Sequence, residues 1–388
     1  MNLDIMNIAW ISKIEWGVPH LTSRIKLSEA LRKRGHNVNL YLVKKFGEKD
    51  PSPNNVIFIP TIHLPILSGI FYGLIVFLYF PILLKKKNVD VIIIDCTKVW
   101  LPFVIPLKIL NIPIVLDIRT LPIDRDESFT FKVSMYLSRY VIDGITTITP
   151  DLKNILLDVY NIRNIKIGVW FSGVSINDFD NVSLNKNNFT HIDLKNRKFT
   201  LLYHGDYSPT RGIENLIIAI SKLKNSIKND IRLLIIGMPK EKIKNLYKIS
   251  EDEGVKEQIT ILSTLNYRII AQYLKIADIG IIPLPPKNKW WKVSAPLKTL
   301  EYLASGTPVI ATNIPFHRRI FEKGNCGILL KDATPESIAR GITYLYKNQT
   351  ALKKMGKNGR KIVEEFYTWD TMAKKVEDFL KNIRVNYS

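Results

Sequence analysis

The stretch SAPLKTLEYLASGTPVIAT, residues 294–312, has the pattern of a polar loop, a short helix, a glycine stop and a buried strand. Within it, Lys298 and Glu301 are three residues apart and therefore share one face near the helix N-terminus. Helix N-termini attract anions through free N–H groups and the macrodipole, so a lysine there suits a phosphate. Glu301, one turn further in, can accept hydrogen bonds from sugar hydroxyls. The pair indicates either a nucleotide-sugar site or a surface ion pair on an ordinary helix.

Runs of Val and Ile alternate with helical stretches on either side of this segment. Such runs are typical of strands buried on both faces, so they predict two doubly wound, Rossmann-like parallel sheets in an α/β protein. Ligands of such folds bind at the carboxyl ends of the strands. The expected strands are 6–11, 38–43, 91–95, 112–118, 144–149 and 167–170 in the first half, and 199–204, 231–236, 259–262, 279–282 and 309–311 in the second.

A polar, Asn-rich segment separates the two halves of the chain. At 388 residues the chain is long for one core, so two domains are expected. We predict an N-terminal domain over residues 1–175, a linker over 176–198 and a C-terminal domain over 199–366. The chain ends in helical patterns with a break near Thr368, and residues 367–388 are expected to be a helix that crosses back to the N-terminal domain.

The chain is strongly basic, with 56 Lys and Arg against 35 Asp and Glu and a net charge of +21. The first 180 residues hold only 21 of these cations and 16 of the anions, so most of the excess lies in the second half. A basic protein attracts anionic substrates, anionic membranes or nucleic acid. The lysines between residues 222 and 256 are spread along helices without clustered aromatic residues, which argues against nucleic acid as a partner.

The cysteines and the first residues bear on the cell compartment. Cys96 and Cys326 lie far apart, which speaks against a disulfide framework or a cysteine metal cluster and fits a reducing cytosol. The first residues lack a basic region followed by an apolar run, so no signal peptide is expected. These features predict a cytoplasmic protein.

Residues 64–84 carry no charge and end at Lys85-Lys86-Lys87. This length could span a bilayer. However, prolines and glycines interrupt the segment and a strand pattern follows at once, which favours a buried or membrane-contacting helix. The lysines would suit anionic headgroups, so peripheral contact with an anionic membrane is one expectation.

Two further segments carry candidate ligand contacts. In LLYHGDYSPTRGIENL, residues 201–216, a strand leads through a glycine-bearing loop to Arg211 at a helix start. An arginine there can form two hydrogen bonds to a diphosphate, although a solvent-facing loop arginine has the same pattern. Gly17, in the first loop after a strand, would allow close backbone approach to a ligand or would be a plain turn glycine.

Other candidates lie near strand ends and in loops. Asp117 and Arg119 follow a buried strand, where α/β sites are built, or they form a local ion pair. Trp290 and Trp291 could stack on a base or sugar, or simply pack a lid.

Metal and cofactor motifs are weak or absent in the sequence. The D-x-D pairs at 124–126 and 178–180 lie in polar loops, and we expect no metal site there. The sequence contains no G-x-x-x-x-G-K-[ST], G-x-G-x-x-G, H-E-x-x-H or paired C-x-x-C motif. No cofactor is therefore expected.

These motifs together resemble the retaining glycosyltransferases of family 4, also called glycosyl transferases group 1, over nearly the whole chain. The most specific part is Ser294-x-Pro-x-Lys-x-x-Glu-Tyr-Leu-Ala-x-Gly-x-Pro-Val-Ile-Ala, followed by Gly205 with Arg211-Gly212, the Ala277-Asp278 strand and Ser172-Gly173-Val174. The resemblance implies the GT-B fold, in which two Rossmann-like domains face a central cleft. It also implies a hexosyltransferase (EC 2.4) that uses a nucleotide-sugar without a metal.

The resemblance also implies roles for single residues. Arg211 would contact the donor diphosphate, Lys298 would be the basic residue of the variant motif, and Glu301 would contact the donor ribose. The implied catalytic set is Arg211, Lys298 and Glu301. The implied donor-binding set is Gly17, Gly205, Arg211, Leu262, Leu265, Lys298, Thr299 and Glu301, where 262–265 would hold the base through backbone atoms. The acceptor or cleft set is Asp117, Arg119, Gly173, Trp290 and Trp291.

The chain departs from the family pattern at four places. The first Glu of the E-x7-E motif falls at Val293, and the usual second basic residue after Gly205 is Asp206. The usual His-Asp pair is Arg119-Thr120, and the usual Asn before Gly173 is Ser172. These changes indicate a divergent branch.

The sequence therefore predicts transfer of a sugar, with retention, from a nucleotide-sugar to a glycan that is polyprenyl- or otherwise lipid-linked. Two alternatives remain open. One is a catalytically inactive partner subunit that binds nucleotide or membrane, and the other is a GT-B-fold sugar-nucleotide epimerase.

Overall fold

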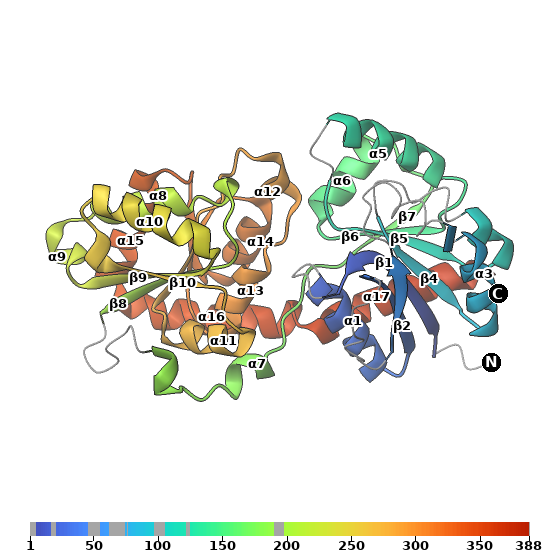
Figure 1. Ribbon diagram of the computed structural model, residues 1–388, viewed down its shortest axis with the longest axis horizontal. Coiled ribbons are helices and arrows are strands. Elements are labelled where there is room, and N and C mark those ends of the chain that lie inside the picture. The colour runs from blue at the N-terminus through green and yellow to red at the C-terminus, as the bar shows by residue number, and fades with distance from the viewer. Residues whose placement is uncertain are drawn as a thin grey trace. The chain divides into compact units, whose positions relative to one another are not determined.

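The computed structural model describes residues 5–16, 21–45, 55–61, 74, 75, 77–96, 105–121, 125–189 and 198–387. The chain divides into two compact units, Met1–Gly173 with Trp369–Ser388, and Val174–Thr368. Each unit is a parallel sheet with flanking helices (Figure 1). The predicted α/β class with two Rossmann-like parallel sheets is confirmed. Gly17 and Asp124 lie outside the described residues, as do 64–73 and Val76 of the uncharged segment.

The first unit has a seven-stranded sheet of order β3-β2-β1-β4-β5-β6-β7. Its strands are β1 Asn7–Glu15, β2 Asn37–Lys45, β3 Val56–Thr61, β4 Val91–Asp95, β5 Ile114–Ile118, β6 Gly144–Thr147 and β7 Lys166–Val169. Its helices include α1 Thr22–Lys33, α3 Phe80–Lys86, η2 Ile105–Leu110, α5 Arg125–Ser138, α6 Pro150–Asp158, α17 Trp369–Arg384 and η6 Val385–Tyr387. Strands β4 and β5 are buried at every position, as their apolar runs predict.

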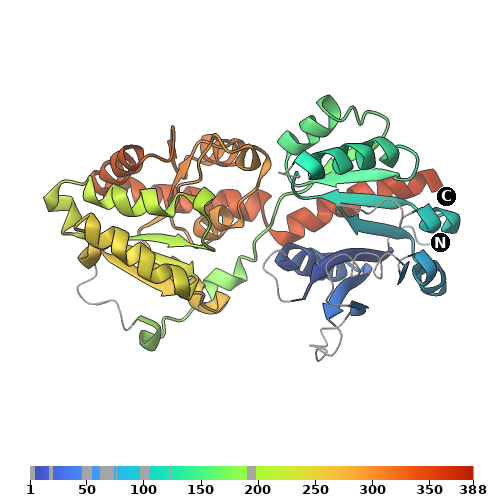
Figure 2. The ribbon, with the colours of Figure 1, turned by 45° about the horizontal axis from the view of Figure 1, so that its top comes forward.

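The helices of this unit cover both faces of its sheet. From β1 to β3 successive strands are added toward one edge of the sheet, and from β4 to β7 they are added toward the other edge. Because the crossover connections are right-handed, α1 lies on one face and α3, η2, α5 and α6 lie on the other. α17 packs against α1 and β7, on the far side of the sheet from α5 (Figure 2). Gly168 makes room for this helix, since a Cβ there would lie 2.7 Å from the Phe379 ring.

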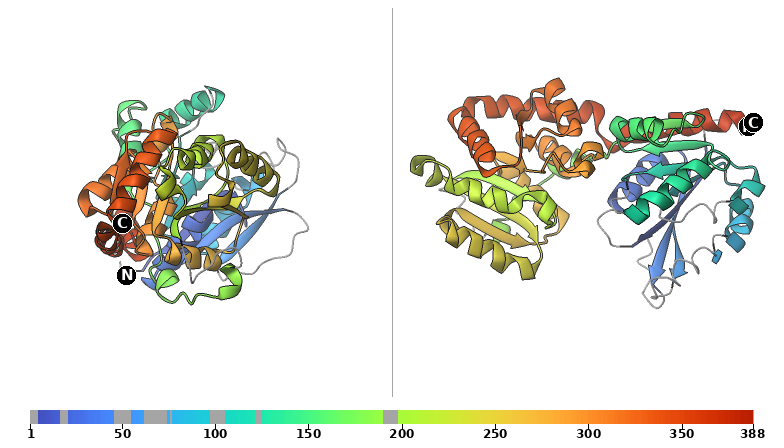
Figure 3. Two further views of the ribbon diagram at one scale, coloured as in Figure 1. Left: turned by 90° about the vertical axis from the view of Figure 1, so that its left-hand side faces the viewer. Right: turned by 90° about the horizontal axis from the view of Figure 1, so that it is seen from above.

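The second unit has a six-stranded sheet of order β10-β9-β8-β11-β12-β13, with helices on both faces (Figure 3). Its strands are β8 Phe199–His204, β9 Ile231–Met238, β10 Ile259–Ser263, β11 Ile279–Ile282, β12 Val309–Thr312 and β13 Gly327–Leu330. Its helices are α7 Asn177–Asp180, η3 Lys186–Phe189, η4 Pro209–Arg211, α8 Ile213–Ser221, α9 Asn225–Lys228, α10 Lys240–Asp252, η5 Lys256–Gln258, α11 Tyr267–Ile276, α12 Lys289–Val293, α13 Leu297–Ala304, α14 Pro315–Gly324, α15 Pro335–Lys347 and α16 Gln349–Phe366.

Two strands were missing from the sequence-based prediction, and both are edge strands. β3 contains Pro60, which an edge strand tolerates because its outer N–H groups have no partner strand. β13 is only four residues long, so its apolar run is short, and only its last residue is buried.

The uncharged segment 64–84 is described in part. Residues 74, 75, 77 and 78 are helical, and α3 follows after a turn at Tyr79. Among the described residues, no helix is long and apolar enough to cross a membrane.

Candidate functional site

Two glycines shape the carboxyl edge of the second sheet, where its parallel strands end. Gly205 follows β8 with φ 133°, and Gly237 lies near the end of β9 with φ 101°. A Cβ on Gly237 would lie 2.5 Å from the Gly205 carbonyl oxygen, and a Cβ on Gly205 would lie 2.5 Å from Lys298 Nζ. Both positions therefore require glycine, and Gly205 leaves room for the Lys298 ammonium.

Lys298 is a buried cation at the start of α13, with 8% of its surface exposed. Its Nζ donates a hydrogen bond to Tyr203 Oη at 3.3 Å and lies 4.4 Å from the centre of that ring. Burial lowers the pKa of Lys298 to about 7, and the neighbouring charge of Arg211 adds to the effect. No carboxylate of the described residues forms an ion pair with it within 4.0 Å. A bound anion would restore its ordinary pKa and offset the cost of burial.

Arg211 is the last residue of η4, and its neighbours Gly212 and Trp291 hold it in place. Gly212 has φ 72°, and a Cβ there would lie 2.2 Å from the Pro283 carbonyl oxygen, so only glycine lets this turn pack on the end of β11. Trp291 donates from Nε1 to the Thr210 carbonyl at 3.2 Å, and its ring centre lies 5.3 Å from the Arg211 guanidinium. Trp291 is 7% exposed and therefore supports Arg211 from within the unit.

The guanidinium of Arg211 is incompletely paired. Its Nη2 lies 2.8 Å from Asp206 Oδ1, while its buried Nε has no hydrogen-bond partner among the described residues. Asp206 occupies the position where the family usually has a second basic residue. It is the partner of Arg211 and is itself mostly exposed.

Glu301 lies one turn along α13, with 6% of its surface exposed. Burial raises the pKa of Glu301 to about 7, although Lys298 and a hydrogen bond from Tyr267 act in the opposite direction. His204 Nε2 lies 3.5 Å from Glu301 Oε2, and burial lowers the pKa of His204 to about 3, so this imidazole is neutral. Glu301 and His204 thus form a polar pair with capacity for a further hydrogen bond.

Two tyrosines tie these elements together. Tyr302 Oη donates to the Leu202 carbonyl at 2.8 Å and accepts from His204 N at 3.1 Å, which locks α13 onto β8. Tyr267, the first residue of α11, links Glu301 to the loop that contains Leu265. Leu262 and Leu265 are half-buried at the end of β10 and just after it.

Thr299 faces the interior of the second unit. The Thr312 carbonyl can only accept, so His317 Nδ1 donates to it at 2.8 Å. The neutral Nε2 of His317 then accepts from Thr299 Oγ1 at 3.1 Å. The Thr299 hydroxyl therefore anchors α13 and does not point to a ligand.

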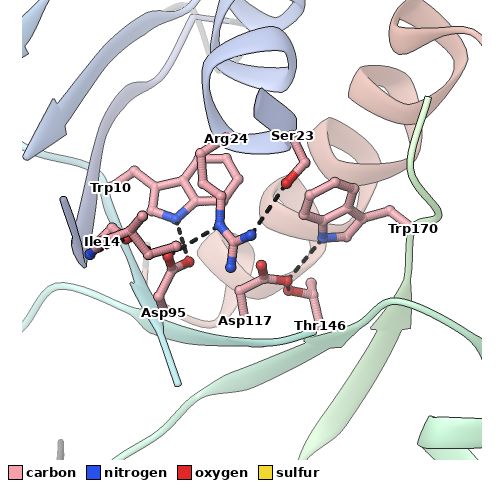
Figure 4. Close-up of polar contacts among 9 residues, drawn as sticks. Trp10, Ile14, Ser23, Arg24, Asp95, Asp117, Thr146 and Trp170 are labelled. Carbon is pink, nitrogen blue, oxygen red and sulfur yellow. Dashed lines mark hydrogen bonds and ion pairs between the residues drawn. The ribbon is translucent and has the colours of Figure 1, made fainter. Parts of the chain in front are cut away.

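The carboxyl edge of the first sheet carries a buried polar cluster (Figure 4). Asp95, at the end of β4, accepts hydrogen bonds from Trp10 Nε1 at 3.0 Å, Ser12 Oγ at 2.5 Å and Arg24 Nε at 3.1 Å. Its charge is thus matched by Arg24 of α1. This pairing was not predicted, because Arg24 and Asp95 are distant in sequence.

Asp117 and Arg119 lie beside this cluster and are less completely paired. Asp117 Oδ1 accepts from Thr146 Oγ1 at 2.7 Å and from Trp170 Nε1 at 3.1 Å. Arg119 lies 3.5 Å above the Trp170 ring and donates to the carbonyl of that residue at 2.8 Å. Asp117 Oδ2 and Arg119 Nη2 are buried with no hydrogen-bond partner among the described residues. Both atoms therefore keep unused hydrogen-bonding capacity at this edge.

The remaining candidates have packing contacts. A Cβ on Gly173 would lie 2.9 Å from Trp369, so this glycine admits the start of α17. Trp290 is half-buried next to Trp291. Val293 is 2% exposed in α12, so the position that usually carries the first Glu is part of the apolar interior. The described residues contain no group of three His, Cys, Asp or Glu side chains that could hold a metal ion.

Sequence reasoning placed Lys298, Glu301 and Arg211 in this part of the chain and His204 near a strand end, where it could line a cleft or be a solvated loop histidine, but it missed Tyr203 and Tyr267. Only the fold brings Tyr203, His204 and Tyr267 to α13. The one signal in the sequence was the polar pair Tyr203-His204 at the end of an otherwise apolar strand.

Two family descriptions match the chain in succession. Glycosyltransferase Family 4 matches residues 25–178, and Glycosyl transferases group 1 matches residues 185–362.

Curated relatives are distant. An uncharacterized glycosyltransferase of Methanocaldococcus jannaschii, MJ1607, is 27% identical over 261 residues, which cover 66% of this chain and 64% of the relative. The GDP-mannose-dependent alpha-(1-6)-phosphatidylinositol monomannoside mannosyltransferase of Mycobacterium tuberculosis is 24% identical over 174 residues, 45% of each chain. The chain spans about 60% of the length of the first relatives it matches, from 59% to 64%.

Solved structures share the fold over nearly their full length. A glycosyltransferase from Rickettsia africae superposes with a TM-score of 0.77 at 17% identity and covers 97% of this chain and 98% of that one. HepE of Anabaena in complex with UDP-glucose gives 0.73 at 14% identity, with coverage of 97% and 100%.

Proposed function

Because this chain belongs to glycosyltransferase family 4, within the glycosyl transferases group 1, we propose that it transfers a hexosyl group from a nucleotide-sugar to a glycan acceptor with retention of configuration. The observation that carries this proposal is the Lys298 ammonium at the carboxyl edge of the second sheet. It is buried, has no ion-pair partner among the described residues, and lies beside Gly205 and the incompletely paired Arg211.

The chemistry follows from the charges at this edge. The acceptor hydroxyl oxygen bonds to the anomeric carbon as the bond to the diphosphate breaks, and the hydroxyl proton passes to a diphosphate oxygen on the same face. Lys298 and Arg211 oppose the negative charge that develops on the departing diphosphate. Glu301, beside neutral His204, accepts hydrogen bonds from ribose hydroxyls. No nucleophile from the protein is needed, and no metal ion is invoked.

We further propose that the acceptor is bound at the carboxyl edge of the first sheet. The unpartnered Asp117 Oδ2 and Arg119 Nη2 are the groups that would meet its hydroxyl or phosphate oxygens. The donor is a UDP- or GDP-hexose in this proposal, because HepE has been solved with UDP-glucose and the mycobacterial relative is named for GDP-mannose.

We also propose that the acceptor is lipid-linked and that the protein works at the cytoplasmic face of a membrane. Leu74, Phe77 and Leu78, together with Ile82 of α3, are large, exposed apolar side chains, and Lys85–Lys87 follow them. On α5, Phe131, Ser134, Met135 and Ser138 form the buried face, and further large apolar side chains are exposed. The exposed residues of α5 and its end are Phe129, Lys132, Val133, Tyr136, Leu137 and Tyr140. Such surfaces suit a bilayer interface.

A calorimetric screen of UDP-, GDP-, ADP- and dTDP-hexoses tests the donor site. We expect one donor to bind and to raise the melting temperature by mass action. Arg211→Ala should abolish the shift, and Lys292→Ala, at an exposed neighbouring position, should retain it. Absence of binding by any donor to folded protein would contradict the proposal.

One observation favours a second candidate, a partner subunit that binds nucleotide without transfer. Val293 is buried and apolar where the family usually has a carboxylate. Donor binding without sugar transfer or donor hydrolysis, across a panel of glycan and lipid-linked acceptors, would select this candidate. The Glu301–His204 pair leaves an epimerase open, and interconversion of free UDP-sugars without acceptor would identify it.

A further inference from the structure

An apolar pocket with a volume of about 400 Å³ lies in the first unit, between β2, β3 and the helical stretch that ends in α3. Its volume falls within the range of about 300–1,000 Å³ that is typical of small-molecule sites. The lining residues are Tyr41, Ile57, Phe58, Ile59, Ile75, Tyr79, Phe80 and Leu83. None of them is charged, so the walls suit a hydrocarbon chain.

Among the described residues that line the pocket, the hydroxyl of Tyr41 is the one buried polar side-chain group. Tyr41 is 0% exposed, and its ring packs edge-on against Phe80 with ring centres 5.1 Å apart. Its Oη has no hydrogen-bond partner among the described residues. Burial raises the pKa of Tyr41 to about 12, with a smaller contribution from Tyr79, so the hydroxyl stays a neutral donor. A neutral donor among apolar walls suits a neutral acceptor and does not suit a phosphate, which needs cations.

The rim of the pocket lies on the exposed apolar helix. Tyr79 lines the pocket and is 56% exposed, so it forms part of the rim. Leu78, just before it, and Ile82 of α3 are exposed as well, and Lys85–Lys87 follow at the end of α3. Lys44 lies above the Phe58 ring on the β2 side. A chain that leaves a bilayer here would stay in contact with apolar side chains while its headgroup met lysines.

We propose that this pocket binds one acyl chain of an ester-linked membrane glycerolipid, whose ester carbonyl accepts a hydrogen bond from Tyr41 Oη. The proposal rests on the membrane contact proposed above and gives it a specific anchor. An isoprenoid tail fits the walls less well, because it carries no acceptor and would leave the Tyr41 hydroxyl unpartnered.

The test compares an ester with its ether analogue. 1-Oleoylglycerol and 1-O-oleylglycerol, both below their micelle concentrations, are titrated into the full-length protein by calorimetry. We expect the ester to bind about fivefold more tightly, the size of one neutral hydrogen bond. Tyr41→Phe keeps the shape of the pocket and should remove this preference while the ether still binds. Ile57→Trp should fill the pocket and weaken both ligands at least about tenfold.

A matched variant and a competing ligand complete the test. Tyr140→Phe removes an exposed hydroxyl of the same unit and should bind like the wild type. Equal affinities for ester and ether in the wild type, or a preference that survives in Tyr41→Phe, would overturn the proposal. Tighter binding of geranylgeranyl phosphate than of the ester would assign the pocket to an isoprenoid and also overturn it.

Flotation and donor binding separate this proposal from the one it rests on. Ile57→Trp should keep the wild-type affinity for the donor, because the donor site is in the other unit. If the wild type ignores anionic vesicles but binds 1-oleoylglycerol in a Tyr41-dependent way, the membrane contact is wrong and the pocket assignment survives. If the wild type floats with vesicles but binds neither 1-oleoylglycerol nor 1-O-oleylglycerol, the pocket assignment is wrong and the membrane contact survives.

Discussion

The two units share one folding plan but differ in what they expose and in how they hold charge. In the second unit the exposed large apolar side chains of the described residues are isolated, at Leu184, Tyr267 and Tyr344. In the first unit most of them lie on residues 74–82 and on α5 or just after it. Most of the excess positive charge, by contrast, belongs to the second half of the chain. Although the two units share a fold, the second is suited to an anionic ligand and the first to an apolar partner.

The carboxyl edges differ in the same sense. At the first edge Asp95 is paired with Arg24, and Asp117 and Arg119 lie beside them. At the second edge Arg211 is paired with the exposed Asp206, whereas the buried Lys298, beside Glu301, forms no ion pair among the described residues. A buried cation without an ion pair carries a desolvation cost, which an anionic ligand offsets. The unpaired Lys298 is the physical reason to place the diphosphate at the second edge.

The largest expected effect comes from removing those cations. Lys298→Ala and Arg211→Ala should each lower the transfer rate by about 10²–10³, because each removes a charge that stabilises the leaving diphosphate. Glu301→Ala should also lower the transfer rate while the fold stays intact. Radiolabelled sugar transfer and the melting temperature measure both quantities. Near wild-type rates in all three variants would place the donor site elsewhere.

The apolar surface of the first unit gives the next effect. Leu78→Glu with Ile82→Glu should reduce flotation with anionic vesicles by at least about tenfold, because two charges must then enter the interface. Leu184→Glu with Tyr344→Glu, at two exposed positions of the second unit, adds the same charge as a matched control and should float like the wild type. Equal loss in both proteins would show that net charge alone governs binding.

Two buried glutamates, one in each unit, should respond to pH in opposite directions. Burial raises the pKa of Glu301 to about 7, above its ordinary 4.5, so its contribution to stability is lost as pH rises through 7. Burial alone would also raise the pKa of Glu377, but hydrogen bonds from Lys381 and Arg34 outweigh it and lower the pKa to about 2. Its contribution is present above pH 4.5 and is lost as pH falls toward 2.

Glutamine substitutions test this contrast. At pH 8, Glu301→Gln should raise the free energy of unfolding of the ligand-free protein and Glu377→Gln should lower it, each by about 1–3 kcal/mol. The Glu301→Gln difference should vanish near pH 5 and the Glu377→Gln difference near pH 2. Thermal unfolding across this range gives the answer, and shifts of the same sign at pH 8 would refute the contrast.

The smallest effect is expected at Tyr267. Tyr267→Phe removes a hydrogen bond to Glu301, and the apparent KM for the donor should rise about threefold to tenfold, as for one bond to a charged group. Tyr344→Phe should leave the KM unchanged. An unaltered KM in Tyr267→Phe would mean that Tyr267 does not orient Glu301 toward the donor.

The fold was predictable where the signal is local. Val/Ile runs located every central strand, and the spacing of Lys298 and Glu301 placed them on one helix. The edge strands β3 and β13 escaped prediction because a proline and a short run weaken the apolar pattern. The sequence also did not predict which way side chains point. Thr299 and Trp291 lie in the segments that form the site, but their side chains pack in the interior of the unit. The Tyr203–Lys298 and Glu301–His204 contacts required the strand order of the sheet.

The central claim is that Lys298 is a buried cation without an ion-pair partner among the described residues, and that a diphosphate supplies this partner. Calorimetric titration of UDP and GDP at pH 7, in two buffers of different ionisation enthalpy, measures affinity and proton uptake together. With a pKa of about 7 in the free protein, binding should take up about half a proton at Lys298. Lys298→Met should lose this uptake and most of the affinity, and Lys292→Met should keep both. Equal affinity and proton uptake in Lys298→Met and the wild type would contradict the account.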